Sequence, residues 1–291
     1  MQLPLGAVRR ALTANTILVY TSAPNYPHGV VDDIEAIARI AQRAGVGCHV
    51  DNCLGGFLMS ALAAQGLLAP ECSNFDLTVP GVTSISVDVH KYGFAAKGAS
   101  VVLYSSVALR RSQYTLVTDW PGGLYATPGA GGSRGGCAIA QAWATLTYMG
   151  WDAYLRVAKR VHATWTTLRD EIAATPGLRI VGHPAASVVA FTSDVFDIYK
   201  VADEMKASGG WEVDRMQRPP CLHICVTAKT EHVAAHWLAD LRAASIKCQD
   251  SPAQVAEGMA GIYGQASIVP DRSIVSDILA SYLDVVYTAS E

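Results

Sequence analysis

A lysine that directly follows a predicted strand is the residue of this chain best placed for covalent chemistry. Apolar and polar residues alternate between Thr83 and His90, which predicts a strand with two different faces, and two glycines then mark a turn. Lys91 therefore lies at a strand end, where open α/β sheets bind their ligands. Its amine could attack a carbonyl carbon if burial or a neighbouring cation lowered its pKa. The alternative is an ordinary solvated lysine, which is the commoner case for a lysine considered alone.

A carboxylate follows another predicted strand upstream. Asp51 lies near the end of the short apolar segment 47–53 and precedes the sequence Asn-Cys-Leu-Gly-Gly-Phe. A lone aspartate in such a place favours a helix cap or a turn. Because the lysine strand follows downstream, Asp51 also fits a carboxylate that keeps the ring nitrogen of a cofactor protonated, so that the ring can act as an electron sink.

Glycine-rich segments after the lysine strand could bind phosphate. Residues 131–136 read Gly-Gly-Ser-Arg-Gly-Gly and precede a helix predicted to begin near Ala138. Backbone amides and Arg134 beside the N-terminus of that helix would form a phosphate cradle, and Lys97 is a second candidate cation. The alternatives are a flexible connection and an ordinary surface lysine.

The seven cysteines of the chain have no regular spacing, which argues against a disulfide framework. Cys221, His223 and Cys225 alternate, so a strand would place all three on one face, where a metal site is conceivable. Zinc sites usually have Cys-x-x-Cys spacing, and no fourth ligand is evident. We therefore favour a packed strand over a zinc site.

The elements that would position these residues follow an α/β order. Four strands are predicted over residues 16–22, 47–53, 83–90 and 99–106. Asp32 and Glu35 give a capping-box-like start to a helix between the first two strands. We expect residues 1–150 to form a large domain that contains this sheet.

A long helix is predicted from Trp151 to the breaker sequence Thr-Pro-Gly at residue 175, with a buried stripe of apolar residues. Beyond it, strands are predicted near residues 179–181, 187–192 and 222–227, and helices near 197–207, 231–245 and 273–283. This order is typical of a small α+β domain, so residues 151–291 are expected to form a linking helix and a second, smaller domain.

Composition excludes several classes of function. The net charge of −3 and the lack of a basic run argue against nucleic-acid binding. No apolar segment reaches the roughly 18 residues of a membrane span, and the N-terminus has no signal-peptide pattern, which predicts a soluble, intracellular chain. Only 16% of the 291 residues are charged, so part of the surface is expected to be covered by a partner or by further chain.

The order Asp-x-His-Lys-Tyr-Gly-x-x-x-Lys-Gly, from Asp88 to Gly98, resembles the lysine motif of the group II pyridoxal-phosphate-dependent decarboxylases. Within that family it is most similar to the motif of the sphingosine-1-phosphate lyases. Further motifs in the same order extend the resemblance to nearly the whole chain, at Pro27–Val30, His49–Phe57, Thr118–Gly123, Gly132–Arg134 and Phe196–Tyr199.

This resemblance implies a fold-type I enzyme that uses pyridoxal 5'-phosphate and works as a homodimer with active sites at the subunit interface. Carried over position by position, Lys91 would bind the cofactor, and Asp51 would pair with its pyridine nitrogen. His90 would lie beside the cofactor phosphate, whereas Lys97 and Arg134 would contact the phosphate of the substrate. The implied fold is a partial large-domain sheet with a small C-terminal α+β domain.

The implied reaction is a retro-aldol cleavage of phosphorylated sphingoid bases to a long-chain aldehyde and phosphoethanolamine. A base must remove the proton of the substrate hydroxyl, and His90, Lys91 and Tyr92 are near enough to be candidates. Two alternatives stay open. An amino-acid decarboxylase shares the lysine motif, and a non-catalytic chain could pair with a complete subunit.

The resemblance also implies that the chain begins after a membrane-anchoring helix and a long N-terminal half that binds the cofactor phosphate and stacks on its ring. Full-length relatives are expected at the endoplasmic reticulum membrane, whereas this chain is expected in the cytoplasm. Our hypothesis is a partial family member that keeps the lysine half of the site and has little or no activity alone. Its sheet would lack strands and would leave unpaired edges.

Overall fold

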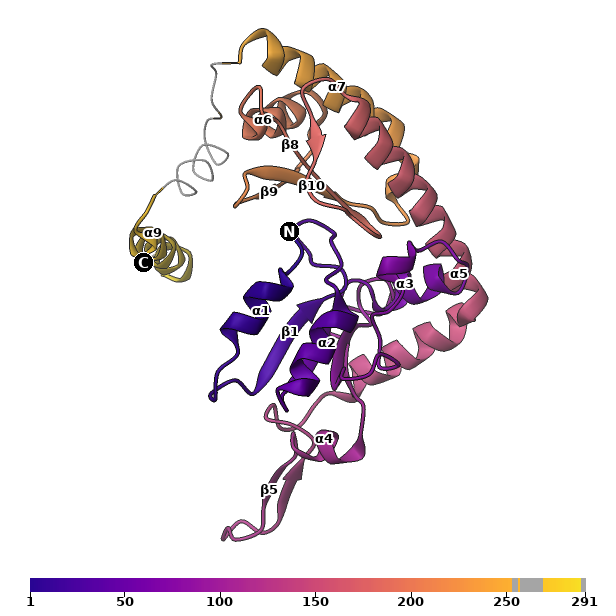
Figure 1. The fold of residues 1–291 in the computed structure, drawn as a ribbon, viewed down its shortest axis with the longest axis vertical. Coiled ribbons are helices and arrows are strands. Elements are labelled where there is room, and N and C mark those ends of the chain that lie inside the picture. Colours follow the sequence, from indigo (N-terminus) through magenta and orange to yellow (C-terminus); the bar gives the residue numbers. More distant parts are fainter. Residues whose placement is uncertain (253–255, 257–268, 289–291) are drawn as a thin grey trace. The chain divides into compact units, whose positions relative to one another are not determined.

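The computed structural model describes residues 1–252, 256 and 269–288 of the chain (Figure 1). These residues form two compact units. The first comprises residues 1–167, 182–189 and 225–231, and the second comprises the remaining described residues from 168 onwards. The domain boundary expected after residue 150 stays a prediction.

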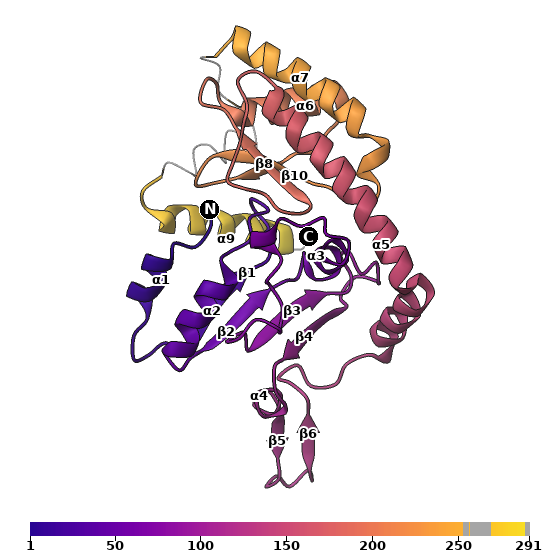
Figure 2. The same ribbon diagram turned by 45° about the vertical axis from the view of Figure 1, so that its right-hand side comes forward.

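Four strands of the first unit form one mixed sheet in the order of the chain (Figure 2). They are β1 (Leu18–Ser22), β2 (Gly47–Asp51), β3 (Ser84–Asp88) and β4 (Ser100–Tyr104). The first three are parallel, whereas β4 runs antiparallel to β3. All four predicted strands are confirmed, and the strand that precedes Lys91 is one of the two central strands.

The two faces of this sheet differ, as the alternating sequence predicts. Helix α2 (Ile34–Arg43) contacts β1 and β2, and α3 (Gly56–Ala63) contacts β3. Both lie in β-α-β crossovers, which are right-handed and therefore fall on the same side. We call this side the helix face; it carries Val50, Ile85, Val87, Val101 and Leu103. The opposite side, the polar face, carries Tyr20, His49, Asp51, Ser86 and Asp88.

The start of α2 differs from the prediction. Asp33, not Asp32, caps the helix, because its side chain accepts a hydrogen bond from the amide of Ala36 at 3.0 Å. The carboxylate of Asp32 is buried and instead accepts the amides of Leu3 at 2.9 Å and Ser22 at 3.0 Å. Asp32 therefore makes tertiary contacts, one of them with the N-terminal segment, instead of capping the helix.

Two predicted helices meet at Gly150 within α5 (Gly136–Ala174). Gly150 has φ 62° and ψ 165°, a conformation that favours glycine and interrupts the helix. The predicted stripe after the break is confirmed, because all its residues are buried: Tyr154, Ala158, Val161, Trp165, Leu168 and Ile172. Within the first unit, the hydroxyl of Tyr154 donates to the carbonyl oxygen of Gly93 at 2.8 Å, which ties the helix to the turn after Lys91.

Several short elements of the first unit were not predicted. They are α1 (Leu5–Ala11), the 3₁₀ helix Pro70–Cys72, α4 (Val107–Arg111), and the antiparallel pair β5 (Thr115–Val117) and β6 (Tyr125–Thr127). The 3₁₀ helix Thr230–His232 follows later in the chain. Helix α3 was also missed, because its Gly-Gly start indicates a loop rather than a helix.

A second sheet has the order β7-β8-β10-β9. Its strands are β7 (Arg179–Ile180), β8 (Val188–Thr192), β9 (Asp214–Met216) and β10 (Cys221–Cys225), and only β9 was not predicted. The helices of the second unit are α6 (Ile198–Gly209), α7 (Ala234–Asp250) and α9 (Arg272–Tyr287), all of them predicted. Helices α6 and α7 contact each other and bury Met205 and Leu241 completely.

Neither a membrane span nor a metal cluster is found in the part of the chain that the structure describes. No helix there is long and apolar enough to cross a membrane. Cys221 and His223 are buried on β10, as expected for a packed strand. No group of three His, Cys, Asp or Glu side chains among the described residues is arranged to hold a metal ion.

Candidate active site

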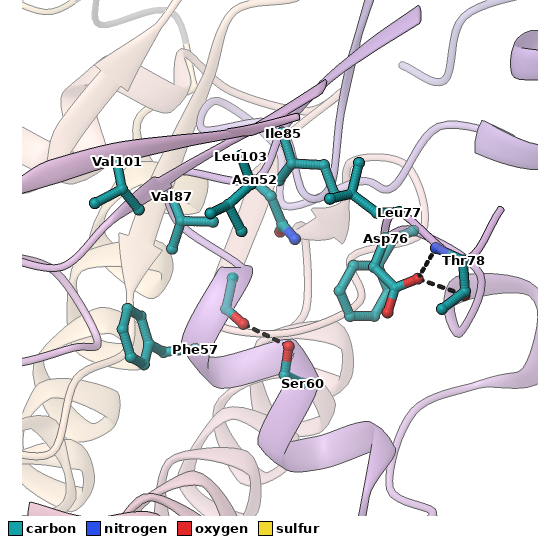
Figure 3. Close-up of a pocket in the computed structure, with 12 residues that line it drawn as sticks. Asn52, Phe57, Ser60, Asp76, Leu77, Thr78, Ile85, Val87, Val101 and Leu103 are labelled. Atoms are coloured by element: carbon teal, nitrogen blue, oxygen red, sulfur yellow. Dashed lines mark hydrogen bonds between the residues drawn. The ribbon is translucent and has the colours of Figure 1, made fainter. Parts of the chain in front are cut away.

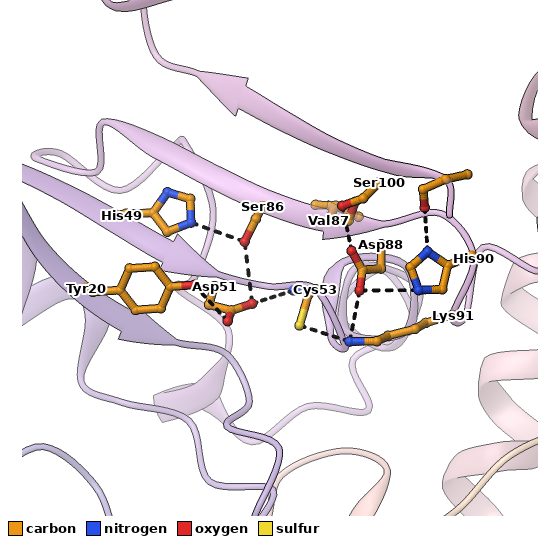
Figure 4. A network of polar contacts seen from close by, with 11 residues as sticks. Tyr20, His49, Asp51, Cys53, Ser86, Val87, Asp88, His90, Lys91 and Ser100 are labelled. Atoms are coloured by element: carbon orange, nitrogen blue, oxygen red, sulfur yellow. Dashed lines mark hydrogen bonds and ion pairs between the residues drawn. The ribbon is translucent and has the colours of Figure 1, made fainter. Parts of the chain in front are cut away.

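Asp51 and Lys91 lie in one polar network at the end of the central strands (Figure 4). The carboxyl ends of parallel strands meet at the same edge of a sheet, so β2 and β3 bring both residues to one place. Cys53 links them. Its thiol sulfur is 3.1 Å from the Lys91 Nζ, and its backbone amide donates to Asp51 Oδ1 at 3.0 Å.

Lys91 is held as an ammonium ion. Its Nζ forms an ion pair with Asp88 Oδ2 at 2.9 Å, and its side chain is about one-third exposed. Partial burial lowers the pKa of Lys91, but the hydrogen bonds and charges of Asp88 and Cys53 outweigh burial and raise the pKa above its ordinary value of 10.5. An ammonium ion cannot attack a carbonyl, so this amine must lose a proton before it can act.

Asp88 is the anion that organises the lysine end of the network. Its Oδ1 accepts the Ser100 hydroxyl at 2.6 Å, and its Oδ2 faces both Lys91 and the Nε2 of His90, the latter at 3.7 Å. Burial raises the pKa of Asp88, but the Ser100 hydroxyl and the Lys91 ammonium lower it by more, so the group stays ionised at neutral pH.

The imidazole of His90 is fixed by the backbone. Its Nδ1 lies 2.8 Å from the carbonyl oxygen of Ala99, so Nδ1 carries a proton and donates it there. That bond leaves Nε2 directed toward Asp88. His90 therefore belongs to the same network as Lys91.

Three donors hold the carboxylate of Asp51. The Tyr20 hydroxyl donates to Oδ2 at 2.9 Å, the Cys53 amide donates to Oδ1, and the Ser86 hydroxyl reaches Oδ1 at 3.4 Å. Burial raises the pKa of Asp51, but the hydrogen bonds from Cys53 and Tyr20 and the charge of Lys91 lower it by more. Asp51 is therefore an oriented anion at neutral pH. Burial and the bond to Asp51 raise the pKa of Tyr20 to about 12, so its hydroxyl remains a donor.

His49 supports this arrangement from the neighbouring position on β2. Its Nδ1 lies 2.8 Å from the Ser84 hydroxyl, and its Nε2 lies 3.1 Å from the Ser86 hydroxyl. The ring centroids of His49 and Tyr20 are 4.9 Å apart. Burial lowers the pKa of His49, although the charge of Asp51 opposes it. A neutral His49 therefore positions Ser86 and Tyr20, both of which contact Asp51.

Two candidate residues lie outside the network. Lys97 is exposed in the turn that follows Phe94. Arg134 lines a cavity of about 380 Å³ between the start of β4 and the first turns of α5. Their contact with a substrate phosphate stays a prediction.

Tyr92 is buried, and its hydroxyl donates to the carbonyl oxygen of Val226 at 2.5 Å. That bond argues against Tyr92 as a general base.

Sequence reasoning missed several members of the network, and three of them, Tyr20, Cys53 and Asp88, contact Asp51 or Lys91 directly. Tyr20 contacts Asp51 only because β1 and β2 pair in a register that places both on the polar face. Cys53 lies two residues after Asp51, a spacing at which an aspartate side chain often accepts a backbone amide, so this contact could have been predicted. Asp88 belongs to the lysine motif, and its position three residues before Lys91 in a turn was the available signal for an ion pair.

Gly55 is expected to be essential for the loop that carries Cys53. A Cβ atom on Gly55 would lie 2.2 Å from the Ala23 carbonyl oxygen and 2.5 Å from the side-chain oxygen of Asn52. Gly55→Ala should therefore lower the free energy of unfolding by about 1–3 kcal/mol, measured by urea denaturation. In Gly135→Ala, the new Cβ would meet no atom within 4 Å, so a change of less than about 0.5 kcal/mol is expected. Equal effects of the two variants would contradict the close packing at Gly55.

Tyr20→Phe is expected to raise the pKa of Asp51, because it removes the hydroxyl that donates to Oδ2 and leaves the ring in place. Carboxyl carbon chemical shifts of Asp51, followed by NMR as a function of pH, measure this change. Tyr148→Phe is the matched control, since Tyr148 is 90% exposed on α5. An unchanged titration of Asp51 in Tyr20→Phe would show that the hydroxyl does not stabilise the carboxylate.

Comparisons with known proteins identify relatives of this chain. No protein-family model matches the chain. The sphingosine-1-phosphate lyase of Dictyostelium discoideum is 43% identical over 285 residues, which cover 98% of this chain and 53% of that protein. Sphingosine-1-phosphate lyase 1 of Rattus norvegicus is 39% identical over 290 residues, 99% of this chain and 50% of that protein. The chain therefore spans about half the length of these relatives.

Solved structures show the same relationship. A sphingosine-1-phosphate lyase of Burkholderia pseudomallei superposes with a TM-score of 0.88 at 37% identity, covering 100% of this chain and 61% of that one. A Lactobacillus brevis glutamate decarboxylase, at 20% identity and a TM-score of 0.72, covers 88% of this chain and shares the fold. The expected α/β fold of fold-type I is confirmed, and nearly the whole chain is similar to about half of the sphingosine-1-phosphate lyases.

Proposed function

We propose that this chain supplies the lysine-bearing part of a pyridoxal-phosphate-dependent aldehyde-lyase. The substrate would be a phosphorylated long-chain (sphingoid) base, and the products a fatty aldehyde and phosphoethanolamine. The observation that carries the proposal is the single network of Lys91, Cys53 and Asp51, in a chain 43% identical to a sphingosine-1-phosphate lyase. Because the chain spans about half of such relatives, we further propose that it has little or no activity alone.

The residues of the network fit pyridoxal phosphate. That cofactor needs an amine for its aldehyde and an anion for its protonated ring nitrogen. Lys91 offers the amine, and Asp51 offers a carboxylate whose pKa is lowered and whose two oxygens are oriented by donors. Cys53 contacts both of them. Lys91 would hold the aldehyde carbon, and Asp51 would hold the ring nitrogen.

Each of these side chains has a distinct task. When bound, pyridoxal phosphate supplies an electron-deficient ring that accepts the electrons of the breaking carbon–carbon bond. Asp51 keeps the ring nitrogen protonated by accepting its hydrogen bond. Asp88 lies 2.9 Å from Lys91 Nζ and holds the amine as an ammonium ion until its proton is lost. His90 and Lys91 remain the candidate bases for the substrate hydroxyl, since the Tyr92 hydroxyl is bonded to Val226.

Contacts with the two phosphate groups and with a second subunit complete the proposal. His90 would lie beside the cofactor phosphate, and Lys97 and Arg134 would contact the substrate phosphate. A homodimer is supported by large apolar side chains exposed on the first part of α5, where Trp143 is 69% and Tyr148 90% exposed. We further propose that the assembled enzyme lies at the endoplasmic reticulum membrane.

Product analysis tests the reaction. The chain, alone and together with a polypeptide that supplies the rest of a relative, is incubated with pyridoxal phosphate and either a phosphorylated sphingoid base or glutamate. Long-chain aldehyde and phosphoethanolamine in equal amounts, released from the sphingoid base, support the proposal. Carbon dioxide released from the amino acid would identify a decarboxylase instead. Cofactor binding with no turnover in either mixture would favour a non-catalytic chain that pairs with a complete subunit.

Asp88→Asn is expected to lower the pKa of Lys91, because it removes the anion and the charged hydrogen bond that hold the ammonium form. The pH dependence of covalent attachment of pyridoxal phosphate should therefore shift toward lower pH. Asp76→Asn, in an exposed loop away from the network, is the control. A shift toward higher pH in Asp88→Asn would show that Asp88 acts mainly as the proton acceptor rather than as the ion-pair partner.

A further inference from the structure

Cys53 and Lys91 place two nucleophiles in direct contact. The Cys53 sulfur lies 3.1 Å from the Lys91 Nζ, although 38 positions separate the two residues in the sequence. The pairing of β2 with β3 holds them there, because each residue follows the end of one of these strands. A thiol is a site of oxidation, and an amine is a nucleophile once it has lost its proton. The pair can therefore react with itself when the sulfur is oxidised.

The neighbour of the Cys53 sulfur determines what an oxidised Cys53 becomes. A cysteine sulfenic acid condenses either with a second thiol, to a disulfide, or with a nitrogen, to a sulfenamide. Cys53 forms no disulfide, and the nucleophile at hydrogen-bond distance from its sulfur is the amine of Lys91. The contact therefore favours a bond to nitrogen.

A small oxidant reaches this pair from the polar face of the sheet. Cys53 is half-buried, and the side chain of Lys91 is about one-third exposed. The apolar cavity of about 400 Å³ on the helix face, which Val87 lines, is not the route (Figure 3). Val87 alternates along β3 with Asp88, the partner of Lys91, so the cavity and the pair lie on opposite faces of the strand.

We propose that a peroxide converts Cys53 and Lys91 into a covalent sulfur–nitrogen bridge, which makes the pair a reversible modification site. In the first step, the Cys53 thiolate attacks one oxygen of the peroxide. The oxygen–oxygen bond breaks, the second oxygen leaves and is protonated to water, and the sulfur is oxidised by two electrons to a sulfenic acid. In the second step, the unprotonated amine attacks that sulfur. The sulfur–nitrogen bond forms, the sulfur–oxygen bond breaks, and hydroxide leaves as water with a proton of the amine.

Thiols reverse the modification without any other reagent. A first thiol attacks the Cys53 sulfur, the sulfur–nitrogen bond breaks, and the released amine of Lys91 takes up a proton. A second thiol then attacks the mixed disulfide and releases Cys53 as a thiol. The two reductant molecules leave as their own disulfide, which balances the two electrons taken up by the peroxide.

The charge states of the pair make the reaction dependent on pH. Burial raises the pKa of the Cys53 thiol above its ordinary value of 9.0, and Asp51 raises it further, whereas Lys91 lowers it. The pKa of Lys91 is raised as well. The other titratable groups of the network around the pair are Tyr20, His49, Asp51, Asp88 and His90. Because the thiolate and the free amine are the reactive forms, the bridge should form faster at alkaline than at neutral pH.

The bridge would prevent cofactor attachment, since it leaves Lys91 without a free amine for the aldehyde of pyridoxal phosphate. This consequence rests on the proposed function, whereas the bridge itself does not. Conversely, an amine already bonded to the cofactor cannot attack an oxidised Cys53. Pyridoxal phosphate and peroxide should therefore exclude each other at Lys91.

Mass spectrometry of the wild-type chain, without cofactor, tests the bridge directly. The chain is treated with hydrogen peroxide, its free thiols are alkylated, and it is digested with trypsin, which cuts after a lysine only when the amine is free. We expect a fragment of residues 44–97, uncut after Lys91 and lighter by two hydrogen atoms than the same sequence in reduced form. Treatment with a thiol should restore cutting after Lys91, and fragmentation of the peptide locates the bond at Cys53.

Three variants assign the two atoms of the bridge. Cys53→Ser should remove the bridged fragment. Lys91→Arg keeps the positive charge but should leave a sulfenic acid on Cys53, which a 1,3-diketone reagent captures. Cys72→Ser is the matched control, because Cys72 is another half-buried free thiol of the same fragment, and it should retain the bridge. Circular dichroism shows whether each variant folds, and the wild-type result depends on none of them.

Two results would overturn the proposal. One is a disulfide or a sulfinic acid at Cys53 while trypsin still cuts after Lys91, and the other is a bridged fragment that persists in Cys53→Ser. Addition of pyridoxal phosphate before the peroxide separates this proposal from the proposed function. If the bridge forms in the chain alone and the cofactor gives no protection, the bridge is supported and cofactor attachment at Lys91 is contradicted.

Discussion

Lys91→Ala is expected to abolish covalent attachment of pyridoxal phosphate. In the mixture with a polypeptide that supplies the rest of a relative, it should reduce carbon–carbon lyase turnover at least about 10³-fold. Alanine has no amine to bond to the aldehyde of the cofactor, and no other lysine occurs in the described network around Asp88 and Cys53. Borohydride reduction followed by peptide mass spectrometry measures the attachment directly. The wild-type chain should carry a pyridoxyl group on Lys91, and the variant should carry none.

The matched control is Lys97→Ala, which removes the neighbouring lysine of the same motif. It should retain the pyridoxyl group on Lys91, while its KM for a phosphorylated sphingoid base rises because a cation for the substrate phosphate is lost. Attachment that persists in Lys91→Ala, or that disappears in Lys97→Ala, would contradict the assignment of Lys91.

The second large effect is expected for Asp51→Asn. A neutral amide removes the anion that keeps the ring nitrogen protonated, so turnover in the same mixture should fall about 10²–10³-fold. The amide has nearly the shape of the carboxylate, and its single oxygen can still accept one of the two donors, the Tyr20 hydroxyl or the Cys53 amide, which donate to different oxygens of Asp51. Attachment of pyridoxal phosphate to Lys91 should therefore persist, which separates loss of chemistry from loss of folding.

Asp170→Asn is the control for this variant, since Asp170 is an exposed residue of α5 that is paired with Arg169. It should leave both turnover and attachment unchanged. If Asp51→Asn turned over as fast as the wild type, the cofactor ring would not be held by this carboxylate.

The local patterns of the sequence were sufficient to predict the main helices and strands. Strands β1 to β4 alternate or are short and apolar, and their order with α2 determines an α/β sheet. For the same reason Lys91 and Asp51 could be placed at strand ends before their contact was known. The apolar stripe along α5 likewise predicted its buried side, because a 3.6-residue period places those residues on one face.

Other features depended on the tertiary structure, because they join residues that are distant in the sequence. Tyr20 reaches Asp51 across 31 positions through the register of β1 and β2, and no local pattern encodes that register. Asp32 and Asp33 are both competent helix caps, and only the position of the N-terminal segment decides that Asp32 binds Leu3 instead.

The sequence by itself determined which residues are chemically competent and on which elements they lie, since side-chain type and periodicity are local properties. The tertiary structure decided the charge state and orientation of those residues. Lys91 is an ammonium ion because Asp88 and Cys53 surround it, and Asp51 is an oriented anion because donors from β1, β3 and the Cys53 loop converge on it. Electrostatic effects of this kind depend on distances in space, which pairing and packing set.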